Sequence, residues 1–196
     1  MDVVRLRSGR EVAIRPIRPD DAKALRDAYD HLSPETKYRR FLAPKPHLGP
    51  SDIRYLVDID RADHYALVAT PAERSDWILG VARFVRLPED PQSAELAVVV
   101  GDPFQGEGLA TELLARLAAP ARERGIIRFR ATMLAHNVPA HKLVRRFAGP
   151  DAHERLLGPT VEVEAPLRSS RGAVEADRSR RTEDRAQPLP GARSGA

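Results

Sequence analysis

The feature that most constrains this sequence is an apolar run that leads through a loop with two glycines into an amphipathic helix. Residues 96–100 read Leu-Ala-Val-Val-Val, and a loop over residues 101–108 follows directly. From Ala110 to Ala121, apolar residues recur every three or four positions, which predicts a helix that Gly125 ends. A strand, a loop and a helix start in this order bring free N–H groups and the positive end of the helix dipole together. The segment is therefore predicted to bind an anion such as a phosphate or a pyrophosphate.

Two common phosphate-binding patterns do not fit this loop. A P-loop would end in Gly-Lys-Ser/Thr, which the loop lacks. The dinucleotide fingerprint would need a small residue where Thr111 stands and an acidic residue about 20 positions further on, where Arg130 stands. The alternative to an anion site is an ordinary strand-to-helix turn, in which the glycines only allow the chain to turn tightly. The pattern that residues 105–110 do match is Q-x-x-G-x-A.

Strand and helix signals alternate along the rest of the chain. The pattern predicts an α/β (α+β) fold with a mixed, mostly antiparallel central sheet flanked by helices, and one parallel crossover between residues 95 and 134. Pro120 is expected to kink the helix after the loop or to split it in two. The expected strands are residues 3–6, 12–17, 65–70, 77–87, 95–100, 126–134 and 161–167, and the expected helices are residues 19–32, 34–41, 51–57, 109–124 and 139–147.

The length of 196 residues suits a single domain. We expect residues 1–168 to form it, and residues 169–196, which are rich in Arg and poor in large apolar side chains, to be a disordered tail. The chain has no cysteine, which excludes disulfides, cysteine-ligated metal sites and a thiol nucleophile. Its six histidines form no helical zinc pair, so no metal is predicted.

The charge pattern and the apolar runs limit the partners that we expect. The formal net charge is +4, but acidic residues lie among the basic ones throughout, without the basic stripe that follows a phosphate backbone. We therefore expect no nucleic-acid partner. The run of five apolar residues at 96–100 is short against the roughly 20 needed to cross a bilayer, and charged residues follow Met1 without a signal-peptide pattern. We expect a cytoplasmic protein without a membrane partner; the sequence does not predict its oligomeric state.

The Q-x-x-G-x-A segment resembles the coenzyme-binding motif Q/R-x-x-G-x-G/A of the GNAT superfamily of acyl-CoA-dependent N-acyltransferases. Residues 15–21, 32–41, 94–97 and 134–137 resemble the bacterial protein-lysine acetyltransferase (Pat-like) branch of that superfamily, and the similarity extends over residues 12–149. The resemblance implies a GNAT-like domain that takes acetyl-CoA as acyl donor. It also implies a primary amine as acceptor, with a protein lysine as the leading class.

The resemblance also implies where the coenzyme binds. A main-chain N–H near Val100 would polarise the thioester carbonyl as a small oxyanion hole, and Asn137, at the start of the last helix, would hydrogen-bond the coenzyme. Strand residues Val98, Val99 and Val100 would pair with the pantetheine arm as if it were an extra strand. The pyrophosphate would be held by the backbone amides of Gln105, Gly106, Glu107, Gly108, Leu109 and Ala110.

Glu95 matches the position of the general base in that branch. A carboxylate early in an apolar strand is expected to be half-buried, which raises its pKa toward neutrality and suits it to accept a proton from an ammonium group. The alternative is that the alternation of a strand points it into solvent. Because the chain has no cysteine, the amine would attack the thioester directly in a ternary complex. The last helix lacks the Tyr that protonates the thiolate in many relatives, so His141 or solvent is the candidate acid.

Two other functions stay open at this point. One is acetylation of a small-molecule amine or amino acid in place of a protein lysine. The other is a catalytically weak module that senses acyl-CoA and contacts a partner. The role of Glu95 discriminates between the two acetyltransferase hypotheses and the sensing module, because only an enzyme needs a base at that position.

Overall fold

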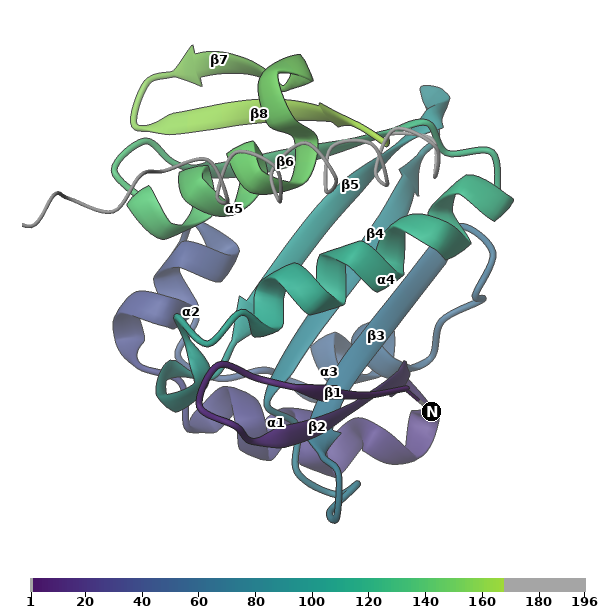
Figure 1. Cartoon of the computed structure of the whole chain (residues 1–196), viewed down its shortest axis with the longest axis vertical. Coiled ribbons are helices and arrows are strands. Elements are labelled where there is room, and N and C mark those ends of the chain that lie inside the picture. Colours follow the sequence, from purple (N-terminus) through teal and green to yellow (C-terminus); the bar gives the residue numbers. More distant parts are fainter. Residues whose placement is uncertain (1, 168–196) are drawn as a thin grey trace, which may run out of the picture.

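The structure, a computed structural model, describes residues 2–167, which form an eight-stranded sheet with helices on both faces (Figure 1). The predicted tail lies outside the described residues. The strands are β1 (Asp2–Arg5), β2 (Glu11–Pro16), β3 (His64–Pro71), β4 (Gly80–Leu87), β5 (Asp90–Val100), β6 (Arg128–Leu134), β7 (His153–Leu157) and β8 (Thr160–Pro166). The helices are α1 (Ala22–Asp30), α2 (Pro34–Phe41), α3 (Pro50–Val57), α4 (Leu109–Glu123) and α5 (Val138–Ala148), with short 3₁₀ turns at Pro19–Asp21, Asp102–Phe104 and Gly149–Asp151.

The sheet has the strand order β1-β2-β3-β4-β5-β6-β8-β7. Every neighbouring pair is antiparallel except β5 and β6, which are parallel and connected through α4. Parallel neighbours need a long crossover, and a helix supplies it. The predicted mixed, mostly antiparallel α/β fold with one crossover is confirmed.

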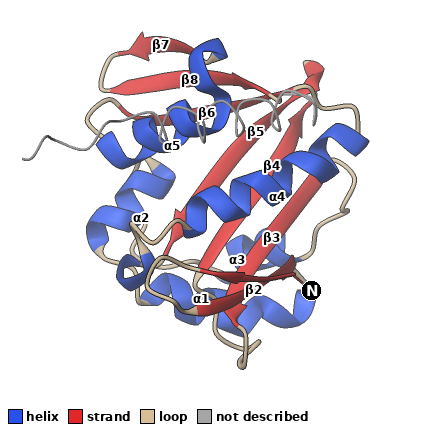
Figure 2. Cartoon of the chain, viewed as in Figure 1, coloured by secondary structure: helices blue, strands red, loops and turns tan. Residues whose placement is uncertain are grey.

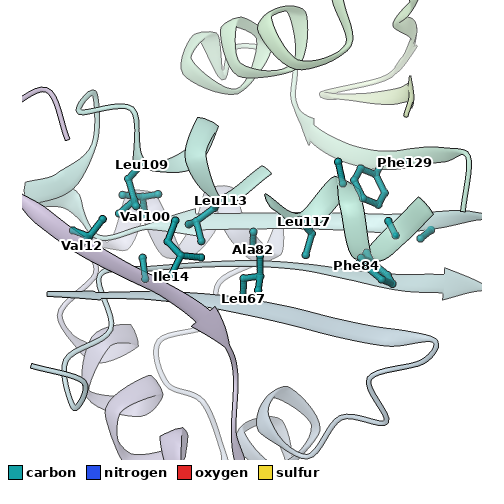
Figure 3. Packing of buried hydrophobic residues seen from close by; sticks show 14 of the residues in the cluster. Val12, Ile14, Leu67, Ala82, Phe84, Val100, Leu109, Leu113, Leu117 and Phe129 are labelled. Atoms are coloured by element: carbon teal, nitrogen blue, oxygen red, sulfur yellow. The ribbon is translucent and has the colours of Figure 1, made fainter. Parts of the chain in front are cut away.

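The central strands are buried on both faces, and successive side chains pack into different cores. On β3, Leu67 and Ala69 face α4, whereas Ala66 and Val68 face the helices α1 and α3. Figure 3 shows the α4 side of this packing, where leucines of the helix meet the sheet. Figure 2 shows α4 lying across β3, β4 and β5, and α5 lying against β6. The alternation of a strand and the apolar stripe of a helix account for both layers.

Strands β5 and β6 separate soon after they meet. They pair only over Ser93–Glu95 on β5 and Arg128–Arg130 on β6, whereas β5 stays paired with β4 as far as Val100. Beyond Arg130, β6 continues to pair with β8 on its other side. A gap therefore opens between β5 and β6 beside the second half of β5, and no strand of residues 2–167 pairs with the edge of β5 there.

Several local predictions are refined by the structure. Strand β4 begins at Gly80, so Trp77 precedes the strand, and α3 begins at Pro50, one residue before the expected start of that helix. Pro120 does not split α4, which is one helix of 15 residues. Strand β7 has no apolar alternation and was not predicted; all five of its residues are exposed on the edge of the sheet.

Asp21, in the turn before α1, forms a buried ion pair with Arg15. Its carboxylate accepts two hydrogen bonds from Arg15, at 2.8 and 2.7 Å, and both side chains are buried, with 8% and 7% of their surfaces exposed. Its Oδ2 also accepts the N–H of Arg18 at 2.8 Å. These bonds hold the pKa of Asp21 below its usual value, against the desolvation that raises it. The ion pair joins β2 to the turn that precedes α1.

Candidate active site

The loop between β5 and α4 places two glycines in the left-handed region. Gly106 has φ 76° and Gly108 has φ 94°, and a Cβ added at either position would meet no atom within 4 Å. Helix α4 begins at Leu109, directly after Gly108. The first N–H groups of a helix have no acceptor within the helix, so the loop directs several donors and the positive end of the dipole toward the same space. This geometry is the one that the sequence predicts for an anion site.

Side chains from distant segments fix the loop. The Nε2 of Gln105 donates to the Val100 carbonyl at 3.1 Å and to the Thr36 hydroxyl at 3.2 Å. Asp102 accepts hydrogen bonds from the Ser33 N–H, at 2.9 Å, and from the hydroxyls of Ser33 and Thr36, at 2.8 and 2.6 Å. These bonds attach the start of α2 to the loop. The Gln105 side chain therefore braces the loop. The Gln105 N–H itself donates to the Asp102 carbonyl at 3.3 Å, so this amide is not free to hold a pyrophosphate as expected, and the N–H groups further along the loop and at the start of α4 are the ones left for a ligand.

The free edge of β5 offers main-chain groups to the gap. The N–H of Gly101 donates to the Leu79 carbonyl at 2.8 Å, on the β4 side of the strand. Main-chain groups of successive residues point to opposite sides, so those of Val98 and Val100 point into the gap and those of Val99 point at β4. An extended arm that adds to this edge would thus pair with Val98 and Val100. Val99 does not supply main-chain contacts there, contrary to the expectation for all three valines.

A cleft of about 750 Å³ occupies this gap. It is lined by β5 from Glu95 to Val100, by the glycine loop, by the start of α4, and by residues of β6 and α5. Among the described residues that line it, five are cationic and Glu95 is the one carboxylate, so the charged lining is strongly cationic. The cations are Arg7, Arg39, Arg40, Lys142 and Arg146.

Asn137 lies where the sequence places it, at the start of α5 and in the wall of the cleft. Its side chain is buried, and its Oδ1 accepts the N–H of Ala140 at 3.3 Å as the helix cap. Within residues 2–167, its Nδ2 donates to no acceptor. That donor is available to a ligand in the cleft.

Glu95 is exposed, so the expectation of a half-buried carboxylate is wrong. It nevertheless lines the cleft and also a second, smaller pocket of about 230 Å³, which we call the inner pocket. The inner pocket lies between α2, α3 and the strands β4 and β5. Arg40, Phe41 and Ala97 line both spaces as well. Glu95 therefore stands at the junction of the two.

His141 is not placed to act as the acid. Its Nε2 lies 3.1 Å from the Ala135 carbonyl and its Nδ1 lies 3.6 Å from the Glu154 carboxylate. It does not line the cleft, although its helix neighbours do. Solvent is the remaining candidate for protonation of the thiolate.

Sequence reasoning missed Arg83, which lies in the wall of the inner pocket. It is 5% exposed, and its Nη1 donates to the Leu56 carbonyl at 3.2 Å and to Nε2 of His64 at 3.0 Å. Burial, with Arg40 nearby, lowers the pKa of Arg83 to about 9. Burial and Arg83 lower the pKa of His64 to about 4. The signal in the sequence is an arginine inside the apolar run of residues 78–85.

As the pH falls from 6.5 to 4, His64 is expected to lower the free energy of unfolding, because its protonation favours the unfolded chain. The unfolded chain protonates this imidazole near its ordinary pKa of 6.5, and the folded chain only near 4, so this stability is complete above pH 6.5 and is lost at about pH 4. The loss amounts to about 3 kcal/mol. Urea unfolding across this range would show it, and His64→Gln, which retains an acceptor for Arg83, should flatten the curve. Equal slopes in both proteins would contradict the assignment.

The comparison with known families agrees with this geometry. Residues 25–149 match the family described as Acetyltransferase (GNAT) family. The chain belongs to this family. The matched GNAT segment begins within α1 and ends just after α5, so it contains the glycine loop, the free edge of β5 and Asn137.

Proteins named Pat are among the relatives of the chain, which confirms the predicted resemblance to the Pat-like branch. The chain is 32% identical over 163 residues to Acetyltransferase Pat of Mycolicibacterium smegmatis, covering 83% of this chain and 48% of that protein. It is 36% identical over 124 residues to Acetyltransferase PA5475 of Pseudomonas aeruginosa, covering 63% of this chain and 66% of that protein. The chain thus spans about half and two thirds of these two relatives. The crystal structure of the GNAT domain of S. lividans PAT superposes with a TM-score of 0.75 and 34% identity, over 84% of this chain and 96% of that one.

Within residues 2–167, no helix has the length and apolar character that crossing a bilayer requires. The same residues contain no group of three or more His, Cys, Asp or Glu placed to hold a metal ion.

Proposed function

We propose that this protein transfers an acetyl group from acetyl-CoA to a primary amine. The observation that carries the proposal is the cleft, in which a glycine loop at a helix start, a free strand edge and five cationic side chains line one space. Acetyl-CoA needs these three things together: donors for its pyrophosphate, a strand edge for its pantetheine arm, and positive charge for its phosphates. Membership of the GNAT family and the named acetyltransferases among the relatives support it.

In the proposed reaction, the amine attacks the thioester carbonyl carbon directly. The new N–C bond forms as the C–S bond breaks, and the sulfur leaves with the bonding electron pair. Glu95 takes one proton of the ammonium group, directly or through one water, so that the neutral amine can attack. The second proton, which the nitrogen loses as the amide forms, passes to solvent, and solvent protonates the thiolate. The N–H of Val100, which points into the gap, donates to the carbonyl oxygen as negative charge develops on it. The pyrophosphate lies against the backbone of residues 105–110.

The similarity to Pat supports a protein lysine as the first acceptor to test. A specific observation favours a second candidate, a small-molecule amine. The inner pocket has a volume of about 230 Å³, which is the size of one small molecule, and Glu95 lies at its junction with the cleft. A module that only senses acyl-CoA would not need this second space.

The first test is a thermal melt with acetyl-CoA, CoA, NAD and ATP in parallel. A ligand present at 100 times its Kd adds about 2.7 kcal/mol, which raises the Tm by roughly 5–10 °C for a chain of this size. We expect this rise with acetyl-CoA and CoA and not with NAD or ATP. A rise with ATP in their place would overturn the coenzyme assignment.

Gly108→Ala is expected to weaken acetyl-CoA binding by about tenfold or more. The new methyl group would stand in the open space beside the loop where the pyrophosphate is proposed to lie. Gly125→Ala is the matched control, because Gly125 has a similar φ of 77°, also faces open space, and lies outside the cleft. Both variants should lose about 1–2 kcal/mol of stability from left-handed strain. Calorimetric titration should show an altered Kd in the first variant alone; equal Kd values would contradict the placement.

A further inference from the structure

Arg83 is a buried cation without an anionic partner. Its side chain is 5% exposed, and no carboxylate of residues 2–167 lies within 4.0 Å of it. Its Nη1 is satisfied by the Leu56 carbonyl and by His64, but its Nε and Nη2 donate to no acceptor in the same part of the chain. A buried charge is costly unless it is paired. The unpaired donors belong to a residue that lines the inner pocket.

Arg40 brings a second guanidinium to the same pocket. It stacks on the ring of Phe41, at 4.9 Å from the centroid, and donates to no acceptor among the described residues. Its pKa is lowered by burial, and the charge of Glu95 opposes that shift. The positive charge of Arg40 also contributes to the lowered pKa of Arg83, so the two cations face each other closely enough to repel.

The two carboxylates in the pocket wall do not neutralise this pair. Asp52 is bound by the Lys45 ammonium at 2.8 Å and caps α3 by accepting the Gly49 N–H at 2.9 Å. Glu95 is exposed and forms no salt bridge with a described residue. The remainder of the wall is largely apolar, with Phe41, Leu48, Leu56, Val85 and Ala97.

The strand register places Arg83 close to Glu95. Arg83 is opposite Ala97, and Val85 is opposite Glu95, so all four side chains lie on one face of the sheet. Arg83 and Glu95 are therefore diagonal neighbours, whose α-carbons are about 7–8 Å apart. A small molecule with an amine at Glu95 would extend toward Arg83 and Arg40, through apolar surroundings.

We infer that the inner pocket binds a free aliphatic amino acid as acceptor, with its carboxylate on Arg83 and Arg40 and its amino group at Glu95. This inference rests on the proposed acetyl transfer and favours a different acceptor from the one that similarity to Pat supports. A lysine within a protein has peptide groups in place of a carboxylate, so it would leave both guanidinium groups unpaired. The product would be an N-acetyl amino acid: the amino nitrogen bonds to the acetyl carbon, CoA leaves as thiolate, and the proton passes to Glu95.

The test compares amino acids with their methyl esters, which keep the amine and lose the carboxylate charge. L-Valine, L-leucine and L-methionine are assayed by release of the CoA thiol, next to lysine-containing peptides. We expect kcat/KM to be about 10- to 100-fold higher for the acids, as one charge-assisted contact provides. Arg40→Gln should abolish this preference without loss of fold, because Arg40 makes no hydrogen bond with a residue of the described part of the chain. Arg54→Gln, on the exposed side of α3, is the control that keeps the preference.

Binding is measured as well, so that the inference does not depend on turnover. Calorimetric titration of each acid and ester into the CoA complex should show a Kd for the acids alone, and Arg40→Gln should remove it. Equal behaviour of acids and esters would overturn the inference. Acetylation of peptide lysines without binding of amino acids would also overturn it, while acetyl transfer itself would stand. If acetyl-CoA is not the coenzyme, the thermal melt would show this separately, because acetyl-CoA and CoA would not raise the Tm.

Discussion

Replacing Glu95 by Gln is expected to lower kcat by about 10²- to 10⁴-fold, the usual contribution of a positioned general base. Gln has nearly the same shape but does not accept a proton at neutral pH. The Kd for acetyl-CoA should stay nearly unchanged, because the proposed coenzyme contacts come from the main chain of β5 and from the loop. The fold should also be unaffected, since Glu95 is exposed and forms no salt bridge with a described residue.

The matched control for this prediction is Glu89→Gln. Glu89 is exposed in the turn before β5 and lines neither the cleft nor the inner pocket. Steady-state kinetics on both variants, with Kd from titration, separate chemistry from binding. If the Glu95 variant retains its kcat, the base is elsewhere. If acetyl-CoA binds to the wild-type protein but no amine is acetylated, the result would favour the acyl-CoA-sensing module over the acetyltransferase.

Asp21→Asn is expected to lower the free energy of unfolding by about 3–5 kcal/mol. The variant would leave the buried Arg15 guanidinium without its counter-charge, and an unpaired buried charge is strongly destabilising. The pKa of Asp21 is lowered in the fold, so the contribution is present at neutral pH and is lost as the pH falls through the range in which carboxylates protonate. Chemical denaturation at pH 7 measures the change.

An exposed ion pair provides the comparison. Glu11 pairs with Arg5 at 2.8 Å, but their side chains are 51% and 72% exposed. Such pairs contribute about 0–1 kcal/mol, so Glu11→Gln should barely change stability. A loss of less than 1 kcal/mol in Asp21→Asn would show that Arg15 finds other partners, for instance the Ser75 carbonyl, which it already contacts at 3.1 Å.

Helix α2 lies beside both spaces of the site and is attached to the glycine loop. Asp102 attaches the start of α2 to the glycine loop, and the end of α2 supplies Arg40 and Phe41 to both the cleft and the inner pocket. Hydrogen bonds from Ser33 and Thr36 lower the pKa of Asp102, so it stays ionised at neutral pH. The proposed sites of the acyl donor and of the acceptor are thus connected through α2 and its hydrogen bonds to the loop.

The sequence alone determined the elements that depend on local pattern. The 3.6-residue period of α4, the left-handed glycine that ends it and the run of valines in β5 all follow from the conformational preferences of neighbouring residues, and the structure has them where they were predicted. The match of residues 105–110 to a coenzyme motif is equally local. These features were sufficient to locate the anion-binding loop, and the alternation of strand and helix signals along the chain was sufficient for the fold class.

Tertiary structure decided which side chains meet inside the site. Arg83 and Glu95 become neighbours only through the register of β4 and β5. Arg40 joins them through the packing of α2, whose start is attached to the loop by Asp102. The exposure of Glu95 and the withdrawal of His141 from the cleft depend on packing in the same way. A pocket is the space left between elements, and its shape depends on their register and mutual packing, which local periodicity does not specify.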